Sequence, residues 1–213
     1  MATQNRAIRT RRAILEAAAT VFSEHGYAAA KVADILELAE VTKGALYFHF
    51  DSKEELARAV IDAQAADAPP RAAQALRTQE FVDLGMVFAH RLTHSVLLRG
   101  SLRLTGESGE CELNRPSPYR DWTRQGTALL EEAAGQGELL PGTDPAETAG
   151  LVVASYAGVH MMARALDELH DLERRMSALY RHVMPGVAVP RVLAALDMAP
   201  GRGARVLAAA AGG

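Results

Sequence analysis

The segment KVADILELAEVTKGALYFHFDSK, residues 31–53, decides the fold, because its pattern is typical of two short helices joined by a tight turn. Its first half places apolar residues at the spacing that buries one face of a helix: Val32, Ile35, Leu36 and Ala39. Thr42 is a favourable N-cap for a second helix that runs to about His49. The segment therefore predicts a helix-turn-helix.

The second of these helices presents an unusual exposed face. Lys43 and Tyr47 stand four residues apart and share that face, whereas Leu46 and Phe50 turn inward. Gly44 leaves a gap between the two exposed side chains, which allows another surface to approach the backbone. A cation, a gap and a phenol suit the major groove of DNA and its phosphate walls. Ordinary core packing is the alternative explanation for two short amphipathic helices.

The flanking residues extend the pattern in both directions. Ser52 and Glu55 form a capping box for a third helix, so Lys53 lies in its first turn, close to where a backbone phosphate would bind. A preceding helix over residues 6–25 ends at Gly26. Its apolar stripe consists of Ile14, Leu15, Ala18, Val21 and Phe22.

The stretch VTKGALYFHFDSKEELA resembles the DNA-binding domain of the TetR family of bacterial transcriptional repressors, and the resemblance extends over about residues 6–65. It implies an all-α protein with a helix-turn-helix domain over residues 1–52 and a connecting helix over about 52–66. A larger helical-bundle domain for ligand binding and dimerisation would follow over 67–213. The resemblance also implies the DNA contacts. Thr42 would position the recognition helix, and Lys43, Gly44 and Tyr47 would face the groove. Phosphates would be contacted by Tyr47, His49 and Lys53. For His49, a partly buried ring bonded to backbone is the alternative.

Two positions depart from the family pattern. Ala30-Lys31 stand where the family carries Ser or Thr, so the hydroxyl cap is missing, although Lys31 can replace its phosphate contact as a point charge. Glu40 occupies a turn position that is usually Gly. A positive φ there would cost about 1 kcal/mol, and the carboxylate is unfavourable near DNA. These departures leave open a helical protein–protein module that has lost DNA binding.

Composition and charge are compatible with this interpretation. The net charge is −3, but residues 1–53 carry seven basic and six acidic side chains, with four arginines before residue 13. Cys111 is the only cysteine, which excludes an intrachain disulfide and leaves an inert loop thiol as the simplest interpretation. The N-terminus lacks the apolar core of a signal peptide, and no apolar run is long enough to cross a bilayer. We expect a cytoplasmic protein without a membrane segment.

The rest of the chain predicts further helices and a dimer. Residues 65–70 mark a boundary, and a Gly-, Pro- and Asn-rich loop is expected over 106–118. The predicted helical segments are 78–98, a short turn over 99–105, 119–135, a helix capped by Asp144 that runs to about Glu168, 171–184 and 190–198, before a Gly- and Ala-rich tail that frays. Residues 148–166 are apolar nearly all round. The resemblance and the spacing of successive major grooves both favour a homodimer on a pseudo-palindromic operator.

A narrower resemblance concerns the ligand. The segments PSPYRDW, VTKGALYFHF and VPRVLAALD are similar to those of γ-butyrolactone receptors of actinobacteria, repressors of antibiotic production and differentiation that a small autoinducer releases from DNA. This implies that Trp122 contacts a γ-butyrolactone or butenolide and that Gln64 and Ser155 supply hydrogen bonds. Phe88, Val159 and Met162 would line an acyl slot. The alternatives are a core Trp122, an exposed Gln64, a Ser155 that packs between helices, and apolar residues that belong only to the core. The resemblance further implies that ligand-responsive receptors are acidic and unresponsive ones basic, so the sequence pI of about 6.2 favours a ligand-responsive receptor.

Other function classes receive little support. His90 and His94 stand four residues apart, a spacing that can chelate a metal, but no companion ligand is evident, so no metal site is expected. No nucleophile elbow or phosphate-binding loop is present, so neither catalysis nor a cofactor is expected. The main alternative is a TetR-type regulator of efflux or metabolic genes that responds to another apolar ligand.

Overall fold

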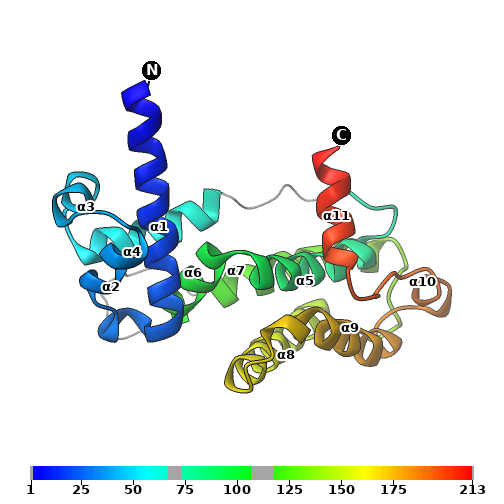
Figure 1. Ribbon diagram of the computed structural model, residues 1–213. Coiled ribbons are helices and arrows are strands. Elements are labelled where there is room, and N and C mark those ends of the chain that lie inside the picture. The colour runs from blue at the N-terminus through cyan, green and yellow to red at the C-terminus, as the bar shows by residue number, and fades with distance from the viewer. Residues whose placement is uncertain (1, 67–72, 107–117, 213) are drawn as a thin grey trace. The chain divides into compact units, whose positions relative to one another are not determined.

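The computed structural model describes residues 2–66, 73–106 and 118–212, and these residues confirm the all-α prediction (Figure 1). Within them the β content is a single bridge between Leu139 and Ala188. The helices are α1 Ala2–Ala29, α2 Val32–Leu38, α3 Lys43–His49, α4 Lys53–Ala66, α5 Arg77–His94, α6 Val96–Gly106, α7 Pro118–Gly135, α8 Pro145–Ala165, α9 Leu172–Val183, α10 Pro190–Leu193 and α11 Arg202–Ala211, with 3₁₀ turns at Leu169–Asp171 and Met184–Gly186. No helix of the described ranges is both long and apolar enough to cross a membrane.

The chain forms two compact units. The first consists of Met1–Ala68 and Ser95–Ser117, and the second of Pro69–His94 and Pro118–Gly213. The second unit therefore interrupts the first in the sequence. The functional division that we expect at residue 66 stays a prediction. The predicted loop over 106–118 and its Cys111 lie outside the described residues, except for their ends.

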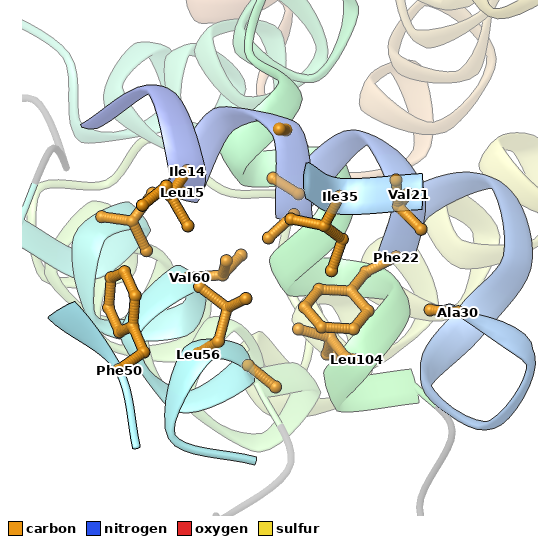
Figure 2. Close-up of a cluster of buried hydrophobic side chains, with 14 of the residues drawn as sticks. Ile14, Leu15, Val21, Phe22, Ala30, Ile35, Phe50, Leu56, Val60 and Leu104 are labelled. Atoms are coloured by element: carbon orange, nitrogen blue, oxygen red, sulfur yellow. The ribbon is translucent and has the colours of Figure 1, made fainter. Parts of the chain in front are cut away.

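The core of the first unit is built on α1. The side chains of Ile14 and Phe22 are fully buried and meet residues from α2, α3, α4 and α6 (Figure 2). Helix α6 comes very close to α1, because a Cβ on Gly100 would lie 2.6 Å from the carbonyl oxygen of Ala19. Gly26 has φ 74° and interrupts the helical backbone at the predicted end of the first helix. The core thus fixes α2 and α3 against a rigid support.

Four expectations about helix boundaries were wrong. The helix predicted over 78–98 ends at His94, and Val96–Gly106 is a full helix rather than a short turn. The new helix starts because Ser95 accepts a hydrogen bond from the Leu98 backbone N–H at 3.2 Å, as an N-cap does. Helices α8 and α10 also end earlier than predicted, at Ala165 and Leu193.

The C-terminal tail was expected to fray, but residues 202–211 form α11, which packs on α5. Arg202 makes a two-pronged ion pair with the buried Asp83, at 2.8 and 2.7 Å. Gly203 permits the close approach, since a Cβ there would lie 2.2 Å from the carbonyl oxygen of Met86. The glycine that suggested flexibility is therefore a packing residue.

A buried carboxylate fixes the other end of α5. Glu138 is 2% exposed and accepts hydrogen bonds from the backbone N–H groups of Arg77 and Thr78, at 3.0 and 2.8 Å. It thereby satisfies donors that the first turn of a helix leaves unpaired. Helix α5 is thus anchored at its start by a residue 60 positions away and along its length by α11.

Candidate nucleic-acid interface and ligand site

The turn between α2 and α3 has the geometry of a Schellman motif. The Val41 N–H donates to the Leu36 carbonyl and the Glu40 N–H to the Glu37 carbonyl, both at 3.1 Å. Glu40 itself has φ 52°, as expected for a residue in the position that favours glycine. The predicted positive φ is therefore confirmed.

Helix α3 begins where the sequence predicted. Thr42 has an extended backbone, and its Oγ1 accepts a hydrogen bond from the Ala45 N–H at 3.2 Å. Leu46 and Phe50 are each 1% exposed and hold the inner face of the helix in the core. The local pattern is sufficient to place the remaining side chains of this helix on the outer face.

That outer face carries the predicted groove residues. Lys43 and Gly44 are exposed and Tyr47 is 41% exposed, with the Lys43 Nζ 5.9 Å from the Tyr47 ring centroid. A Cβ on Gly44 would meet no atom within 4 Å. The packing of this chain therefore does not require glycine at this position, although glycine weakens a helix. The close approach of an external surface to the backbone would account for a glycine at this position.

Cations and a second aromatic ring surround this face. The Lys53 Nζ lies 4.6 Å from the Tyr27 ring centroid, and the Ser52 Oγ accepts from the Glu55 N–H at 3.0 Å, which confirms the predicted cap. Lys31 is exposed at the start of α2 and makes no side-chain cap. Half-buried His49 makes an edge contact with Phe48 at 5.1 Å.

Sequence reasoning missed Phe48, which is 80% exposed on α3. Together with the exposed Tyr47, this ring gives the outer face of α3 an apolar surface that is available for an external contact. The signal was available, because Phe48 directly follows Tyr47 and Leu46 already occupies the inner face. Arg11, one of the four N-terminal arginines noted in the sequence, has its guanidinium carbon 4.9 Å from the Phe50 ring centroid.

The second unit contains a cluster of four aromatic rings, Phe88 on α5, Tyr119 and Trp122 on α7, and Tyr156 on α8, which we call the aromatic cluster. Phe88 lies at its centre, with ring centroids 4.6 Å from Trp122 and 5.2 Å from Tyr156. Tyr119 makes an edge contact with Trp122 at 5.4 Å. The four rings together provide an apolar and polarisable surface for a ring-shaped ligand.

Tyr156 is the polar member of the cluster. Its side chain is 8% exposed, and its hydroxyl finds no hydrogen-bond partner in the described residues. Burial, with a smaller contribution from Tyr180, raises the pKa of this hydroxyl well above its ordinary value, so it stays a neutral donor. A buried hydroxyl without a partner costs free energy and commonly marks a place where a ligand or water binds.

The predicted ligand residues are distributed unevenly around this cluster. Phe88 and Trp122 belong to it, whereas Ser155 and Val159 are half-buried on α8 and Met162 is 54% exposed. Gln64 lies in α4, and its side chain is outside the described residues. Sequence reasoning missed Tyr156, because α8 is apolar nearly all round and its periodicity did not single out an inner face. The neighbouring Ser155 was chosen instead.

Comparison with known proteins places these features in a family. Residues 14–60 match the model for bacterial regulatory proteins of the tetR family, and residues 116–179 match that for the tetracyclin repressor-like C-terminal domain. The chain is 39% identical to the A-factor receptor protein of Streptomyces griseus over 194 residues, which are 91% of this chain and 69% of the receptor.

Two solved structures share the whole architecture. The full-length TetR regulator tylp from Streptomyces fradiae is 42% identical with a TM-score of 0.77, over 96% of this chain and 99% of that one. A γ-butyrolactone receptor described as ArpA-like is 26% identical with a TM-score of 0.72, over 94% of this chain and 97% of that one. TetR-family regulators are DNA-binding transcription factors and not enzymes. The recognition helix, the relatives and the shared fold agree: the chain belongs to the TetR family of bacterial regulatory proteins, and the resemblance to γ-butyrolactone receptors is confirmed.

Proposed function

We propose that this DNA-binding repressor is released from a pseudo-palindromic operator by a γ-butyrolactone or butenolide autoinducer. The observation that carries the ligand class is the aromatic cluster, in which Phe88 contacts both Trp122 and Tyr156, and the Tyr156 hydroxyl has no hydrogen-bond partner in the described residues. The similarity to the A-factor receptor protein and to a solved γ-butyrolactone receptor supports the same class. The target genes would then be those of antibiotic production or differentiation. The protein itself would act in the cytoplasm.

The DNA contacts follow from the exposed face of α3. Lys43 and Tyr47 would enter the major groove, while Gly44 lets the backbone approach base edges. Phe48 would contact a thymine methyl group, which is the apolar feature of that groove. Thr42 fixes the start of the helix, and the phosphate contacts would come from Lys31, His49 and Lys53.

A homodimer would set two such helices at operator spacing. Helix α8 exposes Leu151 and Met161, and the residue that caps its end is the exposed Leu166, each more than half accessible. Exposed apolar side chains on one helix of this length favour a protein interface. Two recognition helices must lie about 34–36 Å apart to enter successive major grooves, which a symmetric dimer achieves.

The chemistry of the aromatic cluster suits a lactone. The Tyr156 hydroxyl would donate to the lactone carbonyl, and the Trp122 indole would cover the ring. Gln64 and Ser155 remain proposed hydrogen-bonding residues, and Val159 and Met162 remain proposed acyl contacts. Such a ligand releases DNA only to the extent that it binds the released state more tightly than the DNA-bound state.

The test is a fluorescence-anisotropy titration of the protein onto its own upstream promoter DNA across a salt series, with and without a synthetic γ-butyrolactone. We expect binding that weakens steeply with salt and is abolished by the lactone. Trp122→Ala should keep operator affinity and lose release, whereas Trp122→Phe should retain partial release. If no lactone or butenolide releases the protein from promoter DNA, the repressor function would stand but the proposed ligand class would be wrong. Another apolar effector would then be the better candidate. Equal loss of DNA binding in Trp122→Ala would make Trp122 structural.

A further inference from the structure

A cluster of three potential metal ligands lies in the second unit. His90 and His94 come from α5 and Glu173 from α9. Each residue offers one ligand atom, and the three atoms all lie within 4.8 Å of one another. Two ligand atoms about 2.1 Å from one tetrahedral zinc ion lie about 3.4 Å apart, so side-chain rotations that bring these atoms about 1–1.5 Å closer together would complete the site. Sequence spacing does not reveal Glu173 as a companion ligand, because it lies 83 positions beyond His90.

Existing hydrogen bonds orient both imidazole rings. The Nδ1 of His90 lies 2.7 Å from the Glu173 carboxylate, which only accepts hydrogen bonds, so this Nδ1 is the donor. The Nδ1 of His94 lies 2.8 Å from the His90 carbonyl oxygen and 2.7 Å from the Thr93 hydroxyl. Hydrogen bonds of this kind orient the rings of metal-binding histidines.

The carboxylate is itself held in place. The Oε2 of Glu173 accepts a hydrogen bond from the Gly201 N–H at 2.9 Å, just before α11. The two imidazole rings are stacked, with centroids 4.2 Å apart and an interplanar angle of 28°. An ion pair between α5 and α9 would explain His90 and Glu173, but it gives no role to the exposed His94. A bound cation accounts for all three residues.

We propose that His90, His94 and Glu173 form a binding site for a divalent transition-metal ion of the Zn²⁺ class. Both histidines would coordinate through a ring nitrogen, Glu173 would exchange its hydrogen bond to His90 for a bond to the ion, and water would complete the shell. Two imidazoles and one carboxylate suit Zn²⁺, Ni²⁺ or Cu²⁺, whereas Mg²⁺ and Ca²⁺ prefer oxygen ligands alone. The ion would join α5 to α9, and α5 also carries Phe88 of the aromatic cluster, so metal and effector binding would be coupled.

The experiment uses the full chain without a polyhistidine tag, stripped with a chelator and titrated with Zn²⁺ against a chromogenic indicator. We expect one Zn²⁺ per chain and a higher melting temperature with Zn²⁺. His94→Ala and Glu173→Gln should each weaken binding at least about tenfold. Because His94 is exposed, the His94→Ala fold is expected to persist, and far-UV circular dichroism checks it.

His182→Ala is the matched control. His182 is also exposed, and its Nδ1 lies 2.7 Å from the carbonyl oxygen four residues before it, as in His94, but it has no companion ligand among the described residues. Its Zn²⁺ affinity should equal that of the wild type. Replacement of Zn²⁺ by Co²⁺ should give a visible ligand-field spectrum that His94→Ala loses. Equal Zn²⁺ binding by His94→Ala and the wild type, or no binding by the wild type, would overturn the proposal, whatever the outcome of the promoter titration.

Discussion

The Tyr156 hydroxyl leads to an unusual prediction about stability. Tyr156→Phe keeps the ring that lies 5.2 Å from Phe88 and removes only a buried oxygen that has no partner in the described residues. A buried polar group without a hydrogen bond costs about 1–3 kcal/mol, of which the oxygen's removal should recover about 1 kcal/mol. The free energy of unfolding should therefore rise, and the melting temperature should increase by about 2–4 °C for a protein of this size.

Urea denaturation at a fixed protein concentration measures this change, since the stability of a dimer depends on concentration. Tyr180→Phe is the control, because Tyr180 is equally buried but its hydroxyl donates to the Phe81 carbonyl at 3.5 Å. That variant should lose about 0.5–1.5 kcal/mol. Tyr156→Phe should also weaken lactone binding while operator affinity stays the same. A Tyr156→Phe protein that unfolds more easily than the wild type would show that the hydroxyl has a partner in the folded apo protein, and would refute the argument.

Three further changes test the recognition helix and the long apolar helix. Glu40→Gly should raise the free energy of unfolding by about 1 kcal/mol because glycine relieves the positive φ, whereas Glu40→Gln should leave it unchanged. Both variants remove the carboxylate, so both should bind the operator more tightly at low salt in anisotropy titrations. Gly44→Ala should stabilise the fold by up to about 1 kcal/mol in urea yet weaken operator binding, and unchanged operator affinity would contradict close approach at this position. Burial, and then the charge of Arg164, lowers the pKa of His160 from 6.5 to about 4. Between pH 6.5 and about pH 4, the unfolded chain binds a proton at His160 that the folded chain does not. The free energy of unfolding should therefore fall as the pH drops through this range, by about 1–2 kcal/mol more in the wild type than in His160→Gln.

The sequence alone predicted those elements whose signals are local. Helix α3 was predicted from Thr42 to His49, because an N-cap and two inward residues suffice to define so short a helix. The start of α8 was equally local: Asp144 accepts from the N–H groups of Ala146 and Glu147, at 2.8 and 2.9 Å. The positive φ of Glu40 was expected from the resemblance to the TetR family, in which glycine is usual at this turn position. Helix α3 and this turn carry most of the proposed nucleic-acid interface.

Features that depend on distant contacts were not predictable in this way. The break at Ser95 has no glycine or proline to mark it, and apolar residues continue on both sides. The glycines of the last segment suggested disorder, because the close approach of Gly203 to Met86 is a tertiary contact. The missing partner of the Tyr156 hydroxyl is likewise a property of packed neighbours, not of the sequence pattern. Most of the ligand site therefore lay beyond pattern reasoning.

The docking of α11 has a practical consequence for experiments on this protein. Deletion of residues 202–211 would leave the Asp83 carboxylate buried beside Gln79 without its arginine, and a buried charge that loses its partner costs about 3–5 kcal/mol. The same deletion would uncover the face of α5 that carries Met86 and His90. A chain that lacks these residues is thus expected to aggregate when it is expressed. Fluorescent fusions and immobilisation tags should therefore leave α11 intact and be joined to it through a flexible spacer.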